Sequence, residues 1–400
     1  MRDAGAQADA AAPGTDAGNV NPSCPAALAD RITVVSVPVG RNINTGALSQ
    51  WNPPHNIFAA PRVDGSLALA FHDGNGHAVV QRVTAAGVLQ GAVVEVAGQE
   101  LRGFAVVDDV ARNVFAALLV ARPPQMVVVL VNASGGVVRE TPLVGTVDQS
   151  MEGARWIDSW GFEGRAAVVA TANGFNVGAY HGQSGNFGAM GNHQGDRFDV
   201  VDQDGQVNTQ WNWGCSHSVD VRLVVQGGNF VPVCLSDCYP VKGIQQYGGS
   251  GRNTTLLVDD PDGNCAGSAS AHLGSVASMA NGVWVSFTSA NMRASQDMGV
   301  VFLSSSTQAG TPIFLTSDAE HDSAPHVVAY GSNMLAVWQT SAGARMAILD
   351  ATGAVVSAAQ PVNARFRAVE DFQVDAQGNV VWATVGQAAQ SLDVHRVCLR

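Results

Sequence analysis

The chain has 400 residues, a formal net charge of −12 and only 21 Lys and Arg residues. It therefore lacks the clustered cations that neutralise phosphates, which excludes nucleic-acid binding as a function. No apolar run approaches the roughly 20 residues that cross a bilayer, so no transmembrane segment is predicted. The 44 glycines and the low charged fraction of 14% favour short strands joined by turns over long amphipathic helices.

We expect residues 1–30 to be a disordered tether and residues 31–400 to form a single domain. The first 23 residues are rich in Ala, Gly, Asp and Pro and contain no apolar core. They also lack the basic and apolar regions of a signal peptide. Their composition resembles the tether that follows the lipidated cysteine of bacterial lipoproteins. This resemblance implies a lipid anchor upstream of the chain.

Short segments that join a small polar residue to a glycine three positions later recur along the chain. They are Thr84 to Gly87, Asn132 to Gly135, Asp202 to Gly205, Asp260 to Gly263, Thr307 to Gly310 and Asp350 to Gly353. Gly takes a positive φ without a Cβ clash, which suits the end of a hairpin turn. Successive glycines lie 48, 70, 58, 47 and 43 residues apart. A period of roughly 40 to 50 residues is typical of a propeller blade.

A second set of turns lies upstream of most of these segments and completes four strands per unit. Its members are Asp64-Gly65, Gly227-Gly228, Asn281-Gly282, Gly331-Ser332 and Gln377-Gly378. A seventh unit, residues 365–400, is too short for its fourth strand. The run from Arg31 to Val39 can supply that strand and remove an exposed sheet edge. The sequence thus predicts an all-β, seven-bladed β-propeller closed by the N-terminal strand, with a pair of β-sandwiches as the alternative.

Six cysteines near turns and termini indicate disulfides, hence an extracytoplasmic location in the periplasm, on the outer-membrane surface or outside the cell. Cys24 and Cys398 are expected to form a bridge that locks the ring. Cys215 and Cys238 fall almost opposite each other about the Gly227-Gly228 turn, so we expect them to pair. The pairing of Cys234 and Cys265 stays open.

Four histidines precede a first-hairpin turn glycine by ten residues in four blades. They are His55, His217, His272 and His321. They would lie where innermost strands begin and converge on the central opening. Imidazoles in such a cluster favour Cu, Fe or Zn, and an open position would support oxidative chemistry. The alternatives are a histidine inherited with the repeat, or local caps of turns. In blade 6, His326 is a rival to His321.

Further polar residues are placed on the same face as possible partners of the metal ligands. These are His72, Asp73, His193, Asp196 and Asp237. Carboxylates that accept the second imidazole N–H would orient metal ligands, whereas the alternative for each Asp is a turn or cap. Arg222 and Asp220 either line the channel or form an ion pair between blades.

The tether, the disulfide-like cysteines and the repeat resemble those of bacterial exported propeller lipoproteins. At the level of architecture, the histidines are also similar to the four-His iron of carotenoid cleavage oxygenases and to copper centres on other seven-bladed propellers, but no local motif transfers. The first hypothesis is therefore a metal-binding propeller, with a metal-dependent oxidoreductase as its enzymatic form. The alternative is a non-catalytic propeller that binds a small molecule, glycan, peptide or protein. Exposed tryptophans would then form the contact platforms, namely Trp51, Trp156, Trp160, Trp211 and Trp213, unless they pack between blades.

Overall fold

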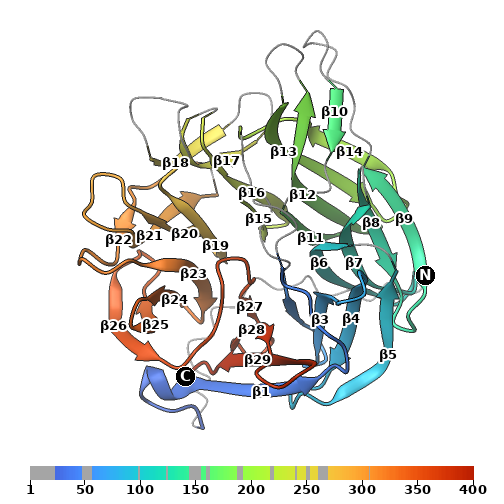
Figure 1. Cartoon of the computed structure of the whole chain (residues 1–400), viewed down its shortest axis with the longest axis horizontal. Helices are drawn as coiled ribbons and strands as arrows, with labels where there is room; N and C mark the ends of the chain where they lie inside the picture. Colours follow the sequence, from blue (N-terminus) through green and yellow to red (C-terminus); the bar gives the residue numbers. More distant parts are fainter. Residues whose placement is uncertain are drawn as a thin grey trace, which may run out of the picture.

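The computed structural model arranges seven antiparallel sheets radially around one axis (Figure 1). It describes residues 23–46, 56–97, 100–122, 125–143, 155–158, 163–186, 192–216, 220–238, 241–248, 253–259, 269–305 and 307–400. The predicted seven-bladed β-propeller is confirmed. No helix in these described ranges has the length and hydrophobicity of a membrane span.

Each blade starts with the strand nearest the axis and proceeds outward. Blade 1 comprises β2 (Phe58–Pro61), β3 (Leu67–His72), β4 (Ala78–Val83) and β5 (Leu89–Val96). Blade 2 comprises β6 (Glu100–Asp109), β7 (Val114–Arg122), β8 (Gln125–Val131) and β9 (Val137–Leu143). Blade 3 comprises β11 (Gly164–Thr171), β12 (Gly174–Asn186), β13 (Asn192–Asp202) and β14 (Val207–Trp211), and β10 (Arg155–Asp158) also pairs with β12. Blades 4 and 5 comprise β15 (Val221–Gln226), β16 (Asn229–Ser236), β17 (Gly243–Tyr247) and β18 (Asn253–Val258); and β19 (His272–Met279), β20 (Gly282–Ser289), β21 (Asp297–Ser304) and β22 (Ile313–Phe314). Blade 6 comprises β23 (Ser323–Tyr330), β24 (Asn333–Thr340), β25 (Gly343–Leu349) and β26 (Val355–Val362), and blade 7 comprises β27 (Gln373–Val374), β28 (Val380–Val385), β29 (Ser391–Val397) and β1 (Ile32–Pro38).

The ring closes through the two ends of the described chain. Strand β1 pairs antiparallel with β29, from Ile32 opposite Val397 to Pro38 opposite Ser391. The predicted disulfide between Cys24 and Cys398 is confirmed, with 5.9 Å between the Cα atoms. Leu28 in the 3-10 turn η1 (Leu28–Arg31) is buried against blades 6 and 7. The folded domain therefore begins by Cys24, before the boundary at residue 31 that composition indicated.

The outer hairpin turns explain the glycine spacing. The N–H groups of Gly87, Gly135, Gly205 and Gly353 donate to the carbonyl three residues earlier, and all four glycines have positive φ. Blade 5 differs, because its turn runs from Ser304 to Thr307 and Thr307 takes the positive φ of 63°. The predicted turn at residues 260–263 lies outside the described residues. The repeat is therefore a repeat of turn geometry, which the sequence pattern located to within a few residues.

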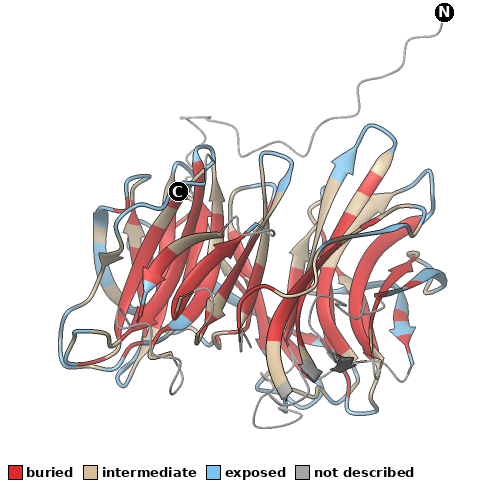
Figure 2. Ribbon diagram, turned by 90° about the horizontal axis from the view of Figure 1, so that it is seen from above, coloured by how far each residue is buried: buried red, intermediate tan, exposed pale blue. Residues whose placement is uncertain are grey.

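Apolar side chains pack between the faces of neighbouring blades. Seven buried clusters occur among the described residues, one at each interface between adjacent blades. Viewed from the side, the middle lengths of the strands are buried and the turns at both edges of the disc are exposed (Figure 2). Because both faces of a blade are covered, strands such as β7 and β20 are buried along nearly their whole length.

The innermost strands approach each other most closely at glycines. A Cβ atom on Gly103 of blade 2 would lie 2.6 Å from the backbone nitrogen of Ala166 in blade 3. A Cβ atom on Gly274 of blade 5 would lie 2.2 Å from the carbonyl oxygen of Pro325 in β23 of blade 6. These glycines let inner strands meet backbone to backbone near the axis.

Candidate functional site: the axial channel

Innermost strands begin on one face of the ring, here called the start face, and finish on the opposite face, called the end face. In three consecutive blades, an acidic residue at the start of the innermost strand is followed two positions later by an arginine. The three segments are Glu100 to Arg102, Glu163 to Arg165 and Asp220 to Arg222. All three arginine side chains are buried. Together these segments bring cations and carboxylates to the start of the axis.

Arg222 joins four blades. Its guanidinium donates to Glu163 Oε1 of blade 3 at 2.8 Å and to the carbonyl of Val221 at 2.8 Å. Its other terminal nitrogen donates to the carbonyl of Leu273 at the start of blade 5 and to the carbonyl of Ala368 ahead of blade 7. Arg222 thus lines the axial cavity and also forms an ion pair with a neighbouring blade. For Arg222, both of the roles considered from the sequence are therefore observed.

The segment between β26 and β27 crosses the start of the axis. Figure 1 shows this red segment reaching the middle of the ring. Three consecutive backbone carbonyls of the segment accept hydrogen bonds from three different blades. The carbonyl of Arg367 accepts from His326 Nε2, that of Ala368 accepts from Arg222, and that of Val369 accepts from Arg165. We call residues 363–372 the axial loop. It covers the start face of the axis and ties blades 3, 4 and 6 to blade 7.

Burial perturbs the ionisation of this network. Desolvation lowers the pKa of Arg102 to about 10, although the charge of Glu100 opposes this. Desolvation also raises the pKa of Asp220 to about 6, and the nearby charge of Glu163 adds to the effect. Glu163 accepts from both Arg165 and Arg222 and is buried with them. The guanidinium groups of Arg165 and Arg222 therefore donate their hydrogen bonds to acceptors within the protein.

A cavity of about 460 Å³ extends along the axis from Arg222 and Asp371, and the innermost strand of every blade lines it. Exposure increases toward the end face along two of these strands, β11 and β15. In β11, Gly164 and Arg165 are buried, the next four residues are half-buried and the last two are exposed. In β15, Val221 and Arg222 are buried and the rest of the strand is half-buried. Among the described residues, the axial loop therefore covers the channel at the start face, and the β11 and β15 side of the channel is more exposed toward the end face.

The walls of the channel are apolar side chains and strand edges. Phe58, Phe104 and Phe372 line it together with alanines and valines of the inner strands. Each inner strand pairs with only one neighbour in its own sheet, so its second edge faces the axis. Such an edge presents N–H and C=O groups that water or a ligand must satisfy.

The histidines proposed as metal ligands occupy different environments. His55 and His217 lie outside the described residues. His272 and His321 are exposed, at the start of β19 and just before β23. His326, the rival in blade 6, is buried; its ring stacks on Phe372 and donates to the axial loop. A shared metal centre at His55, His217, His272 and His321 stays a prediction.

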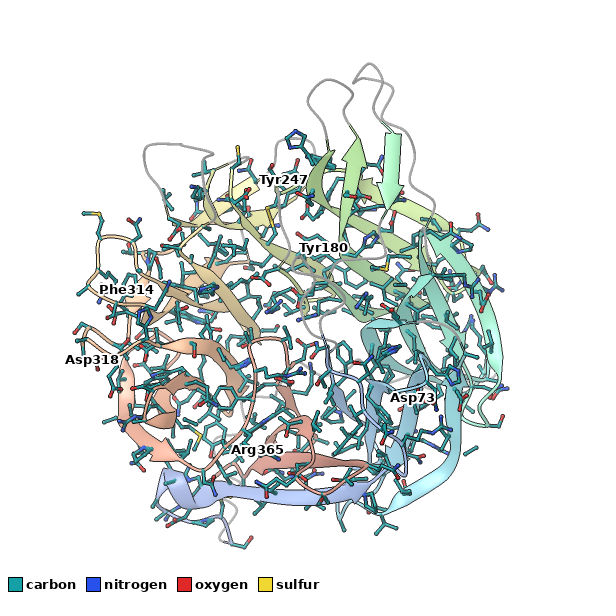
Figure 3. The ribbon with its side chains drawn as sticks, in the orientation of Figure 1. Asp73, Tyr180, Tyr247, Phe314, Asp318 and Arg365 are labelled. Carbon is teal, nitrogen blue, oxygen red and sulfur yellow. A yellow bond between two sulfur atoms is a disulfide. The ribbon has the colours of Figure 1, made fainter. Side chains whose placement is uncertain are left out.

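The residues proposed to orient metal ligands have local partners where the structure describes them. Asp73 accepts from the N–H groups of Asn75 and His77 and pairs with Arg41, as expected for a turn residue. Burial lowers the pKa of His72 to about 4. His193 is half-buried in β13, and the N–H of Asp237 donates to the carbonyl of Ser216. Asp73 follows β3 of blade 1 and Tyr180 lies in β12 of blade 3, with blade 2 between these two blades (Figure 3).

Asp196 lies between blades 3 and 4, where Tyr180 donates a hydrogen bond to it. Burial raises the pKa of Asp196 to about 7. Cys215 and Cys234 are close enough to form a three-residue group with it, the one metal-type group of His, Cys, Asp and Glu that the described residues contain. The two sulfurs are bonded to each other as a disulfide, so they are not thiolate ligands.

The expected Cys215–Cys238 bridge is wrong, because Cys215 pairs with Cys234. The expectation extended the β15–β16 ladder beyond Val221, which lies opposite Cys234. In the described residues the paired register ends at Val221, and Ser216 bridges to Gly195 of blade 3. Cys215 therefore lies over Cys234 at the interface of blades 3 and 4. Cys238 is also disulfide-bonded, to a partner outside the described residues.

Two of the tryptophans considered as contact platforms are half-buried and pack against other residues of the protein. Trp211 contacts Tyr180, Phe198 and Tyr247 between blades 3 and 4. Trp213 lies against Gly195, where a Cβ atom would come within 2.6 Å of the indole. Trp51, Trp160 and the side chain of Trp156 lie outside the description. Trp211 therefore packs between blades, and Trp213 packs against blade 3.

Comparison with known proteins supports no assignment to a family. No protein-family model matches the chain, and no curated protein matches it in sequence. Among solved structures, it is similar to BBS1N in complex with ARL6DN, with 11% identity over 92% of this chain and 97% of that one and a TM-score of 0.48. The AfRom2 CNH domain is similar with 9% identity over 91% and 99% of the two chains and a TM-score of 0.46. A prolyl endopeptidase matches with 17% identity over 81% of this chain but only 44% of its own, with a TM-score of 0.44.

Arg165 and Glu163 complete the network around Arg222, whereas the sequence prediction named only Arg222 and Asp220. The repeated acid–x–Arg pattern at the start of three inner strands was the signal available in the sequence.

Proposed function

We propose that this protein is a non-catalytic propeller that binds a small organic ligand in its axial channel, entered from the end face. The observation that carries the proposal is the channel itself, about 460 Å³ in volume, closed at one end by the Arg165–Glu163–Arg222 network. This volume lies within the range of roughly 300 to 1,000 Å³ typical of small-molecule sites.

Ligand binding in such a channel combines two kinds of contact. The phenyl rings and aliphatic side chains of the walls remove apolar ligand surface from water. The free strand edges supply directional hydrogen bonds to polar ligand groups. The axial loop, held by three blades, keeps the closed end rigid, so the ligand meets a preformed site.

We further propose that the protein works outside the cytoplasm, as a secreted or lipid-anchored protein. Support comes from the Cys24–Cys398 and Cys215–Cys234 disulfides, because such bonds persist in oxidising compartments.

A fragment screen by thermal shift tests the binding function. Wild-type protein is compared with Ala105→Phe, which places a ring at a half-buried lining position, and with Ala85→Phe, which changes an exposed outer turn. We expect compounds that raise the Tm of the wild type to act equally on Ala85→Phe and to lose their effect on folded Ala105→Phe. Hits that stabilise Ala105→Phe as well as the wild type, or a screen without hits, would overturn the channel as the site.

A further inference from the structure

The floor of the channel carries an incompletely compensated negative charge. Asp371 lines the cavity, and its side chain is 24% exposed, in contrast to 3% for Glu163 and Arg165. Its partner within the described residues is Arg165 Nε, 3.4 Å from Oδ1. That nitrogen makes no hydrogen bond, so the contact is a loose ion pair.

The cations beside Asp371 are occupied. Arg222 donates to Glu163 and to three carbonyls, those of Val221, Leu273 and Ala368. Arg165 donates to the carbonyls of Gly164 and Val369 and forms an ion pair with Glu163. An anionic ligand would have to break these bonds in a buried place, which is costly. A cationic ligand needs only the free side of Asp371.

The overall charge of the protein also favours a cationic ligand. The protein has a net charge of −12, and an overall negative potential raises the local concentration of small cations. The walls above Asp371 are apolar, and carbonyl groups of the inner strand edges can accept additional N–H donors. A ligand with an ammonium head and a short apolar body matches this arrangement.

Resting on the channel-binding function proposed above, we propose that the ligand is an organic cation, an ammonium group on an apolar body, with Asp371 as its counter-ion. The ammonium lies at the closed end of the channel and donates to the Asp371 carboxylate. The apolar body lies along Phe58 and Phe104 toward the end face. Charge-assisted hydrogen bonds of this kind are about twice as strong as neutral ones, so selectivity for the cation is expected.

Three probes of similar shape and different charge test this inference by titration calorimetry at pH 7.4 and low salt: 2-phenylethylammonium, 2-phenylethanol and 3-phenylpropanoate. Wild-type protein should bind the ammonium about tenfold or more tightly than the alcohol and should bind the carboxylate most weakly. Asp371→Asn should lose this tenfold preference while keeping its affinity for the alcohol. Asp318→Asn makes the same charge change at the periphery of the ring (Figure 3) and should behave as wild type.

The outcomes separate the two proposals. Equal or tighter binding of the alcohol or the carboxylate, lost in Ala105→Phe, would overturn the cationic ligand and leave channel binding in place. Binding of no probe, or binding unchanged in Ala105→Phe, would overturn channel binding itself. If Asp371→Asn does not fold by circular dichroism, the order of the three wild-type affinities still decides the sign of the ligand charge.

Discussion

The guanidinium of Arg222 lies 3.0 Å from the carbonyl oxygen of Ala368, a residue 146 positions later in the chain. This bond joins the fourth blade to the loop that leads into the seventh, across the axis of the ring. Because Arg222 also pairs with Glu163 of the third blade, one side chain holds the closed end of the channel together.

Removing Arg222 should therefore be costly. In Arg222→Met, Glu163 loses one of its two guanidinium partners and keeps Arg165 and the N–H of Val221, and the carbonyls of Leu273 and Ala368 lose the Arg222 donor. We expect the free energy of unfolding, measured in urea, to fall by about 3 to 5 kcal/mol, as for other broken buried pairs. The control is Arg122→Met, which removes the half-exposed pair with Glu140 and should cost less than about 1 kcal/mol. Equal losses in both variants would contradict the role assigned to Arg222.

The bridge that closes the ring should contribute to stability in the oxidised protein. A Cys24→Ser/Cys398→Ser variant should lose about 2 to 4 kcal/mol, seen as a lower Tm, because the bridge restricts the unfolded chain. Peptide mapping by mass spectrometry of unreduced wild-type protein should recover Cys24 linked to Cys398 and Cys215 linked to Cys234. Recovery of Cys215 linked to Cys238 would contradict the structure.

His326 should make stability depend on pH. Burial lowers its pKa to about 3, so the folded protein keeps the ring neutral while the unfolded chain binds a proton below the ordinary pKa of about 6.5. The stability that depends on the neutral ring is complete above pH 6.5 and is lost as the pH falls from 6.5 toward 3.

We therefore compare wild type with His326→Gln, which keeps a donor for the carbonyl of Arg367. Between pH 7.5 and pH 5, the wild type should lose about 2 kcal/mol more of its free energy of unfolding than the variant does. Urea unfolding at both pH values measures this difference. A difference that does not change with pH would show that His326 does not titrate as its burial requires.

Gly103 should tolerate no side chain. A Cβ atom there would meet backbone atoms of Arg165 and Ala166 within 2.7 Å, so Gly103→Ala must push blades 2 and 3 apart beside the arginine network. We expect a loss of about 1 to 3 kcal/mol in urea unfolding. Gly310→Ala is the control, because its added Cβ would make contacts of 3.5 Å or more with Phe302. A loss in Gly310→Ala as large as that in Gly103→Ala would argue against crowding at the axis.

The histidine hypothesis predicts metal in the purified protein. Elemental analysis of protein made without a histidine tag should find near-stoichiometric Cu, Fe or Zn, and a His217→Ala/His272→Ala variant should lose it. Folded protein that contains no such metal would end this hypothesis and leave the binding functions.

The β-propeller could be predicted because its evidence is local. Glycine, as at Gly135 and Gly205, is favoured where a tight turn takes positive φ, so the turns mark the period of the repeat. The same reasoning predicted that the N-terminal strand completes the seventh blade, because that blade lacked its fourth strand. This placed Cys24 near Cys398 and predicted their bridge. The Cys215 pairing was wrong for the converse reason: it was counted along one hairpin, whereas Cys215 packs against Cys234 at the interface between blades 3 and 4.

Sequence by itself thus determined the number of blades and the closure of the ring, since turn chemistry and strand count need no distant partner. Only the tertiary structure decided what lies on the axis. Glu163, Arg222, His326 and Asp371 come from four blades, and their charges and hydrogen bonds acquire meaning only when the ring brings them within a few ångströms. Contacts between residues so far apart in the chain depend on the packing of whole blades, which no local pattern encodes.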